Sequence, residues 1–141
     1  MRVVVDAVVF VRALINHDGS CGRLLARAGE YDIVLSLEVT HEILGVLQRP
    51  ELRERLYSAA GLPQLQAVLA ILGEAEAVVP GAVVSVCRDS KDDKFFACAI
   101  AGGADYIVSE DEDILAVREY NDVRTIRAAE FLRLLDAPPN V

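Results

Sequence analysis

Four acidic residues stand where strands are expected to end or helices to begin: Asp6, Glu42, Asp93 and Asp111. Asp6 closes the apolar run at residues 2–5, and Asp111 follows a second apolar run. In an open parallel sheet, ligands bind outside the carboxyl ends of the strands, so acids collected there would share one pocket. Oxygen-rich pockets of this kind hold Mg²⁺ or Mn²⁺. The four positions therefore predict a divalent metal site.

Asp6 and Glu42 each have an ordinary structural interpretation as well. Asp6 is suited to cap a helix at residues 7–15, and its spacing favours the cap and the pocket equally. A carboxylate that follows a buried strand is costly to desolvate unless it is paired or bound to metal. Glu42 borders the apolar stripe of its helix, from which it points either into a cleft or, as isolated glutamates more often do, into water.

Asp93 lies in an acidic segment that opens a helix. Asp89 or Ser90 can cap this helix, which places Asp92 and Asp93 in its first turn. The helix dipole stabilises an acid there by about 0.3–1 kcal/mol, which explains at least one of the two. Two adjacent acids, Asp92 and Asp93, are slightly more than the start of a helix requires.

Asp111 lies in a second acidic segment, 109–113. Ser109 and Glu112 are three residues apart, as in a capping box. That arrangement leaves Asp111 and Asp113 without a structural role. Negative charge packed after a strand raises the pKa values of the acids unless a cation relieves the repulsion. Metal binding therefore explains this segment better than capping does.

The elements that must position these acids alternate between strand and helix patterns. This alternation predicts an α/β fold of three α/β/α layers, with a central parallel sheet of four to five strands covered on both faces. The expected strands are 2–5, 32–35, 76–79, 105–108 and 123–126. The expected helices are 7–15, 20–29, 37–48, 51–59, 63–74, 92–102, 111–117 and 128–135.

Composition indicates one globular domain over residues 1–141, with a frayed tail at 137–141. The chain has 141 residues, of which 53% are hydrophobic and 26% charged. No apolar run is long enough to cross a membrane, and no secretory or transit signal is recognisable. Three cysteines without C-x-x-C spacing suggest free thiols in a reducing cytosol, which predicts a cytoplasmic protein.

The net charge of −8 argues against a nucleic-acid ligand without excluding one. A bound divalent metal changes the local sign of the charge. Both lysines of the chain, Lys91 and Lys94, flank the Asp92-Asp93 pair, and Arg88 is nearby. Together with Arg12, these cations are candidates for contacts with phosphates. The sequence has no motif for other common chemistries. It lacks a P-loop, a G-x-G-x-x-G fingerprint, a G-x-S-x-G serine and zinc-ligand spacing of its histidines.

One long segment resembles a known family. Residues 87–115, CRDSKDDKFFACAIAGGADYIVSEDEDIL, have an acid that opens an alanine-rich helix, followed by the pattern Ala-Asp-x-hydrophobic-Val-Ser/Thr-x-Asp. Supporting segments are residues 3–6, 42–50 and 129–132. Together they resemble the PIN-domain family, in particular its toxin-like branch from toxin–antitoxin pairs, over nearly the whole chain.

The resemblance implies a metal-dependent endoribonuclease. Asp6, Glu42, Asp93 and Asp111 match the four family carboxylates, which hold one or two Mg²⁺ or Mn²⁺ ions for RNA cleavage. Asp113 is an accessory acid by its position. The implied substrate is single-stranded or structured RNA. Members of this branch commonly form homodimers and bind a small antitoxin, whose basic side chain can enter the acidic pocket.

The chain departs from the family where Ala7 and Val8 follow the first aspartate in place of Thr-Asn or Ser-Asn. The missing hydroxyl and amide would orient the carboxylate, and such losses cost about 10–100-fold in metal affinity or activity. Glu110 stands where glycine is common and adds negative charge. A weakened PIN-fold module that binds RNA or protein is therefore the alternative. A third hypothesis is another metal-dependent phosphate-transferring enzyme on a doubly wound sheet.

Overall fold

The computed structural model describes residues 1–81 and 84–138, so the end of the expected frayed tail, 139–141, lies outside it. In the described residues, six strands form one sheet in the order β3-β2-β1-β4-β6-β5. The strands are β1 (Arg2–Val5), β2 (Asp32–Leu35), β3 (Glu76–Ala77), β4 (Tyr106–Val108), β5 (Glu119–Tyr120) and β6 (Val123–Ile126). Every pairing is parallel except that of β5 with β6.

The sixth strand corrects the expected four to five. β5 pairs antiparallel with β6, with Tyr120 opposite Val123, so that two residues form the turn. Those residues, Asn121 and Asp122, have φ of 48° and 66°. Two-residue hairpins of this type need positive φ at both positions, which Asn and Asp tolerate. The Asn-Asp dipeptide was therefore the sequence signal for β5.

Eight α-helices occur in the described part of the chain. They are α1 (Ala7–Ile15), α2 (Ser20–Ala26), α3 (Leu37–Leu47), α4 (Pro50–Leu56), α5 (Leu62–Glu74), α6 (Asp93–Gly102), α7 (Glu112–Leu115) and α8 (Ala128–Asp136). Short 3₁₀ turns precede β2 at Ala28–Glu30 and α6 at Ser90–Asp92. The expected helix at 20–29 thus ends early, and the one at 51–59 begins at Pro50, a residue favoured in a first helical turn. None of the helices described is both long and apolar enough to span a membrane.

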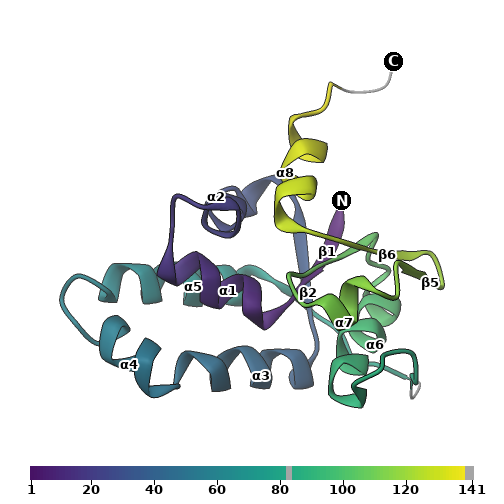
Figure 1. The fold of residues 1–141 in the computed structure, drawn as a ribbon, viewed down its shortest axis with the longest axis horizontal. Helices are drawn as coiled ribbons and strands as arrows, with labels where there is room; N and C mark the ends of the chain where they lie inside the picture. Colours follow the sequence, from purple (N-terminus) through teal and green to yellow (C-terminus); the bar gives the residue numbers. More distant parts are fainter. Residues whose placement is uncertain (82–83, 139–141) are drawn as a thin grey trace.

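Helices cover the sheet on two sides, as expected (Figure 1). α2 packs beside α8 on one side, while α3 packs beside α6 on the other. α6 contacts β1, β2 and β4, the middle of the sheet. On the other side, Phe131 of α8 makes edge-to-face contacts with Tyr31 and Tyr106. Aromatic pairs of this geometry add about 0.5–1.5 kcal/mol beyond the burial of their area.

The core explains why β1 is the central strand. Val3, Val4 and Val5 are completely buried, as expected of a strand covered on both faces. Phe95 and Phe96 of α6 are also completely buried. Full burial of such a side chain contributes about 1.5–3 kcal/mol. β1 and α6 therefore form a rigid frame for the acids at their ends.

Two glycines set the end of α6 against the sheet. A Cβ on Gly102 would lie 2.9 Å from Cγ2 of Val34, so a side chain there would push α6 away from β2. Gly103 ends the helix with φ of 60°, the left-handed conformation that glycine adopts without steric cost. Both glycines allow α6 to lie close to the sheet. The position of the helix in turn sets the position of its first residue, Asp93.

Candidate functional site

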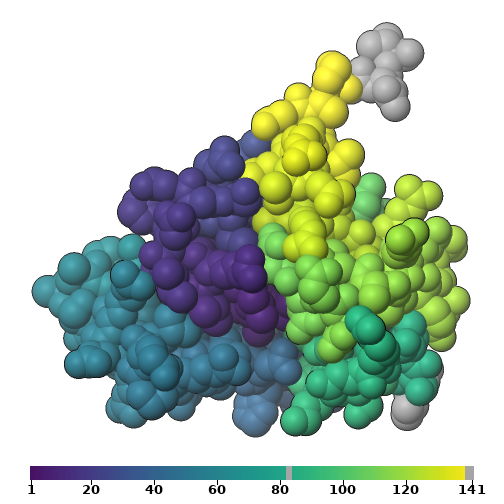
Figure 2. Space-filling view, viewed as in Figure 1, coloured from purple at the N-terminus to yellow at the C-terminus, as the bar shows by residue number. Residues whose placement is uncertain are grey.

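The site lies where the order of the strands reverses. From β1 the chain proceeds outward to β2 and β3, and it then returns to the other side of β1 as β4. Val5 is paired with Val108, and the backbone N–H of Asp6 donates to the Val108 carbonyl at 2.9 Å. The carboxyl ends of β1 and β4 are therefore adjacent. Figure 2 shows the purple N-terminal segment bordering the green segment after β4 on one face.

Asp6 serves as a helix cap and also belongs to the acidic pocket. Its backbone is extended, and its Oδ1 accepts a long hydrogen bond of 3.4 Å from the Val8 N–H at the start of α1. Its Oδ2 accepts a bond of 2.8 Å from the Ser109 hydroxyl. The residue is only 3% exposed. The two interpretations that the spacing left open are thus both compatible with the structure.

Burial raises the pKa of Asp6 to about 6, against an ordinary value of 3.8. The Ser109 hydroxyl opposes this rise, whereas the negative charges of Asp111 and Glu42 add to it. Glu42, one turn into α3, therefore lies close enough to act on the buried carboxylate. A buried acid that other acids surround is a place where a cation binds favourably.

Ser109 connects the two strand ends. Its side chain is completely buried after β4, and its Oγ accepts a bond of 2.9 Å from the Asp111 N–H while donating to Asp6. The expected capping box is wrong: Asp111, not Ser109, caps α7 by accepting from the Asp113 N–H at 2.8 Å. The sequence reasoning missed this role of Ser109. A lone hydroxyl directly after a buried strand was its only signal.

Three carboxylates converge beside Asp6. Asp92, Asp111 and Asp113 each offer one oxygen within 4.8 Å of the others. Asp92 ends the 3₁₀ turn before α6, and the other two lie at the start of α7. Burial is the largest cause that raises the pKa of Asp92 to about 6, followed by the charges of Asp111, Asp89, Asp6 and Glu42 in that order. These acids share one electrostatic environment.

Asp93 lies apart from this group, although the sequence pointed to it. Its Oδ1 accepts bonds from the backbone N–H groups of Val86 at 3.0 Å and Cys87 at 2.8 Å. Burial alone would raise the pKa of Asp93, but these bonds lower it below the ordinary value. Asp93 thus holds the segment before α6 by hydrogen bonds to its backbone. Its neighbour Asp92 is the residue that belongs to the group with Asp111 and Asp113. Asp92 is the N-cap residue of α6 and Asp93 is its first helical residue, and the doubled acid in the sequence could not reveal that their side chains have different partners.

Two acids at the edge of the pocket have cationic partners. Glu42 pairs with Lys94 of α6 at 2.7 Å. Asp113 pairs with Arg88 at 2.8 Å, with both side chains exposed. By contrast, among the described residues no cationic nitrogen lies within 4.0 Å of a carboxylate oxygen of Asp6, Asp92 or Asp111. The negative charge of these three remains uncompensated by the protein.

Glu110 was expected to add charge to the pocket, and the structure shows that its charge is matched. Its carboxylate is paired with Arg127 at 3.1 Å and with Arg12 at 4.0 Å. It also accepts from the N–H of Ala128, the first residue of α8. Glu110 therefore fixes the start of α8, and the two guanidinium groups offset its charge.

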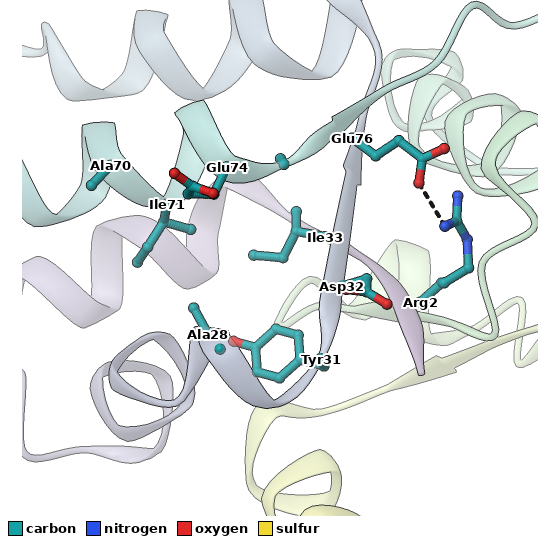
Figure 3. Close-up of a pocket in the computed structure, with 11 residues that line it drawn as sticks. Arg2, Ala28, Tyr31, Asp32, Ile33, Ala70, Ile71, Glu74 and Glu76 are labelled. Atoms are coloured by element: carbon teal, nitrogen blue, oxygen red, sulfur yellow. Dashed lines mark ion pairs between the residues drawn. The ribbon is translucent and has the colours of Figure 1, made fainter.

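A cavity of about 620 Å³ lies at the opposite end of the sheet (Figure 3). Its lining includes Arg2, Asp32 and Glu76, which begin β1, β2 and β3, together with Tyr31 and Ile71. Arg2 bridges to Glu76 at 2.6 Å. Glu76 at this end thus has an arginine partner, and the residues predicted for chemistry lie elsewhere.

The amino-acid sequence is similar to a known protein family and to a known protein. The sequence matches the family described as PIN domain over residues 2–113. A relative named uncharacterized protein MJ1680, from Methanocaldococcus jannaschii, is 32% identical over 123 residues, which are 86% of this chain and 77% of the relative.

Two solved structures share the fold. PAE2754 from Pyrobaculum aerophilum has a TM-score of 0.61 at 16% identity, covering 98% of this chain and 100% of that one. VapBC2 from Rickettsia felis, solved bound to a DNA fragment from their promoter, has a TM-score of 0.55 at 14% identity, covering 90% of this chain and 98% of that one.

Proposed function

The chain belongs to the PIN-domain family, whose members are typically nucleases, and we propose that it is a metal-dependent endoribonuclease that hydrolyses RNA phosphodiester bonds. The observation that carries the proposal is the convergence of carboxylates where β1 and β4 end, of which Asp6, Asp92 and Asp111 have no cationic partner among the described residues. Asp92, Asp111 and Asp113 present oxygens within 4.8 Å of one another, and buried Asp6 acts on the same group. Scattered surface acids would not have this arrangement.

The donor set fits a hard divalent cation. Every candidate ligand is a carboxylate oxygen, the kind of ligand that Mg²⁺ and Mn²⁺ prefer, and no cysteine or histidine is among them. Asp6, Asp92 and Asp111 would hold the ion, with Asp113 as an accessory acid. This set replaces Asp93, the expected third ligand, by Asp92, because Asp92 belongs to the group with Asp111 and Asp113 while Oδ1 of Asp93 accepts from two backbone N–H groups.

The protein side chains would orient the reacting groups. Ser109, the residue after β4, donates to Oδ2 of Asp6 and would thereby supply the hydroxyl that Ala7 lacks. Arg88 pairs with Asp113 and has an exposed side chain, which would contact a flanking phosphate of the RNA. The chemistry that a bound divalent cation supplies is activation of a water near neutral pH and neutralisation of charge on the phosphate.

We further propose that the protein is the toxin of a toxin–antitoxin pair. The likeness to VapBC2 supports the proposal, as does the surface of α5. Only Val68 of this helix is buried, while Leu62 and Leu69 are each 47% exposed. The α4–α5 segment lies at one end of the molecule (Figure 2). An exposed apolar surface there suits a small antitoxin or a second copy of the chain.

A binding module without cleavage is the second candidate function, favoured by Ala7 and Val8 after Asp6. The two are separated by incubating purified protein and Mn²⁺ with an end-labelled single-stranded RNA. The nuclease proposal expects cleavage that EDTA abolishes and that Asp111→Asn reduces strongly. Measurable Mn²⁺ binding by the folded protein without any cleavage would favour the binding module.

A further inference from the structure

The pair between Glu42 and Lys94 differs from the other ion pairs of the molecule. Lys94 Nζ lies 2.7 Å from Glu42 Oε1, which joins α6 to α3 across 52 positions of sequence. Of the ion pairs in the described residues, it is the one in which both side chains are less than a third exposed, at 27% and 29%. Partial removal from water strengthens the attraction between the charges.

This pair belongs to the acidic pocket. Glu42 lies on α3, which packs against α6, and its charge contributes to the raised pKa values of both Asp6 and Asp92. Lys94 comes from the first turn of α6, directly after the segment that carries Asp92. The ammonium therefore stands at the wall of the pocket and neutralises one of its acids, while Asp6, Asp92 and Asp111 keep their charge.

We infer that Lys94 takes the place of a second divalent ion at Glu42, so that the pocket binds one Mg²⁺ or Mn²⁺ through Asp6, Asp92 and Asp111. This inference rests on the proposed metal site and specifies its stoichiometry. It withdraws Glu42 from the expected metal ligands and makes it the partner of Lys94. Removal of the ammonium would free Glu42 and open a second cation position.

Calorimetric titration with Mn²⁺ in the absence of RNA tests the inference. The wild type is expected to bind one ion, and Lys94→Met, which keeps the unbranched stem without the charge, is expected to bind two. Lys94→Arg keeps a cation and is expected to bind one. The double variant Lys94→Met/Glu42→Gln is the matched control, in which the second ion should disappear. Circular dichroism verifies that each variant is folded.

Three results would overturn the inference. These are two ions in the wild type, one ion in Lys94→Met, or a second ion that persists in the double variant and so does not depend on Glu42. Each of them leaves the metal nuclease intact. A wild type that binds no Mn²⁺, or whose binding is unchanged by Asp111→Asn, would remove both the inference and the proposed metal site.

Discussion

The two ends of the central sheet carry acids in opposite circumstances. At the amino end, Arg2 bonds to Glu76 at 2.6 Å (Figure 3), and its backbone N–H donates to Asp105 at 3.0 Å. At the carboxyl end, Asp6 is buried among other acids, and it forms no ion pair with any of the residues that the structure describes. At the amino end, the carboxylate of Glu76 thus has its cation within the chain. The carboxyl end keeps negative charge that an external cation can satisfy.

The pKa values follow the same division. The hydrogen bond and charge of Arg2 lower the pKa of Glu76, whereas burial and neighbouring acids raise the pKa of Asp6 to about 6. Acids of the same chemistry are therefore stabilised in the charged form at one end and destabilised at the other. Acids whose pKa values are raised by burial and by neighbouring charges are typical of functional sites, whereas an acid paired with an arginine is typical of structural ones.

The largest effect is expected from Asp6→Asn. The amide can keep the cap on α1 and the contact with Ser109 but removes the negative charge, so Mn²⁺-dependent RNA cleavage should fall by more than the roughly 10–100-fold that loss of an outer-shell partner costs. Initial rates on a labelled RNA measure the effect, with a thermal melt as the folding control. Cleavage at the wild-type rate would remove Asp6 from the site.

Because of Asp6, the free energy of unfolding of the protein should depend on pH in a defined direction. Its folded pKa of about 6 exceeds the ordinary 3.8, so ionisation opposes folding. This cost, on the order of 3 kcal/mol, is present above about pH 6 and disappears as the pH falls towards 4. In urea denaturation with EDTA, Asp6→Asn should therefore be more stable than the wild type at pH 7.5, with a smaller difference at pH 4.5. A difference that does not change with pH would contradict the assignment.

An intermediate effect is expected from Ser109→Ala. The variant leaves Oδ2 of Asp6 and the N–H of Asp111 without a partner, which costs about 1–3 kcal/mol of stability for a buried group. Because Ser109 positions the carboxylate, Mn²⁺ affinity should fall by about 10–100-fold. Calorimetry measures the affinity. Unchanged affinity with lowered stability would make the hydroxyl purely structural.

The smallest effect is expected at the other end of the sheet. Glu76→Gln removes an exposed pair with Arg2, and exposed pairs contribute little to stability. Cleavage rate and Mn²⁺ affinity should both equal those of the wild type, and the melting temperature should barely change. A marked loss of cleavage in this variant would break the proposed division between the two ends.

The sequence predicted the frame of the molecule better than the directions of its side chains. The buried valines of β1 and the period of the helices placed Asp6, Asp111 and Glu42 near the carboxyl ends of the strands. The pattern could not tell Asp92 from Asp93, because the choice depends on backbone N–H groups of Val86 and Cys87 that only the folded loop brings into place.

Contacts between distant segments were also beyond the sequence pattern. Ser109 reaches Asp6 across 103 positions, and Lys94 reaches Glu42 across 52. Neither pairing has a local spacing by which to recognise it. β5 was different, since its Asn-Asp turn is a local signal with a known backbone requirement.

The neighbouring acids Asp92 and Asp93 offer the most direct test of the site as a whole. Mn²⁺-dependent cleavage of one labelled RNA should be compared for Asp92→Asn and Asp93→Asn, each verified as folded. We predict that Asp92→Asn loses cleavage, because its carboxylate belongs to the group with Asp111 and Asp113, and that Asp93→Asn retains it. Loss of cleavage in Asp93→Asn with activity kept in Asp92→Asn would contradict the proposed pocket.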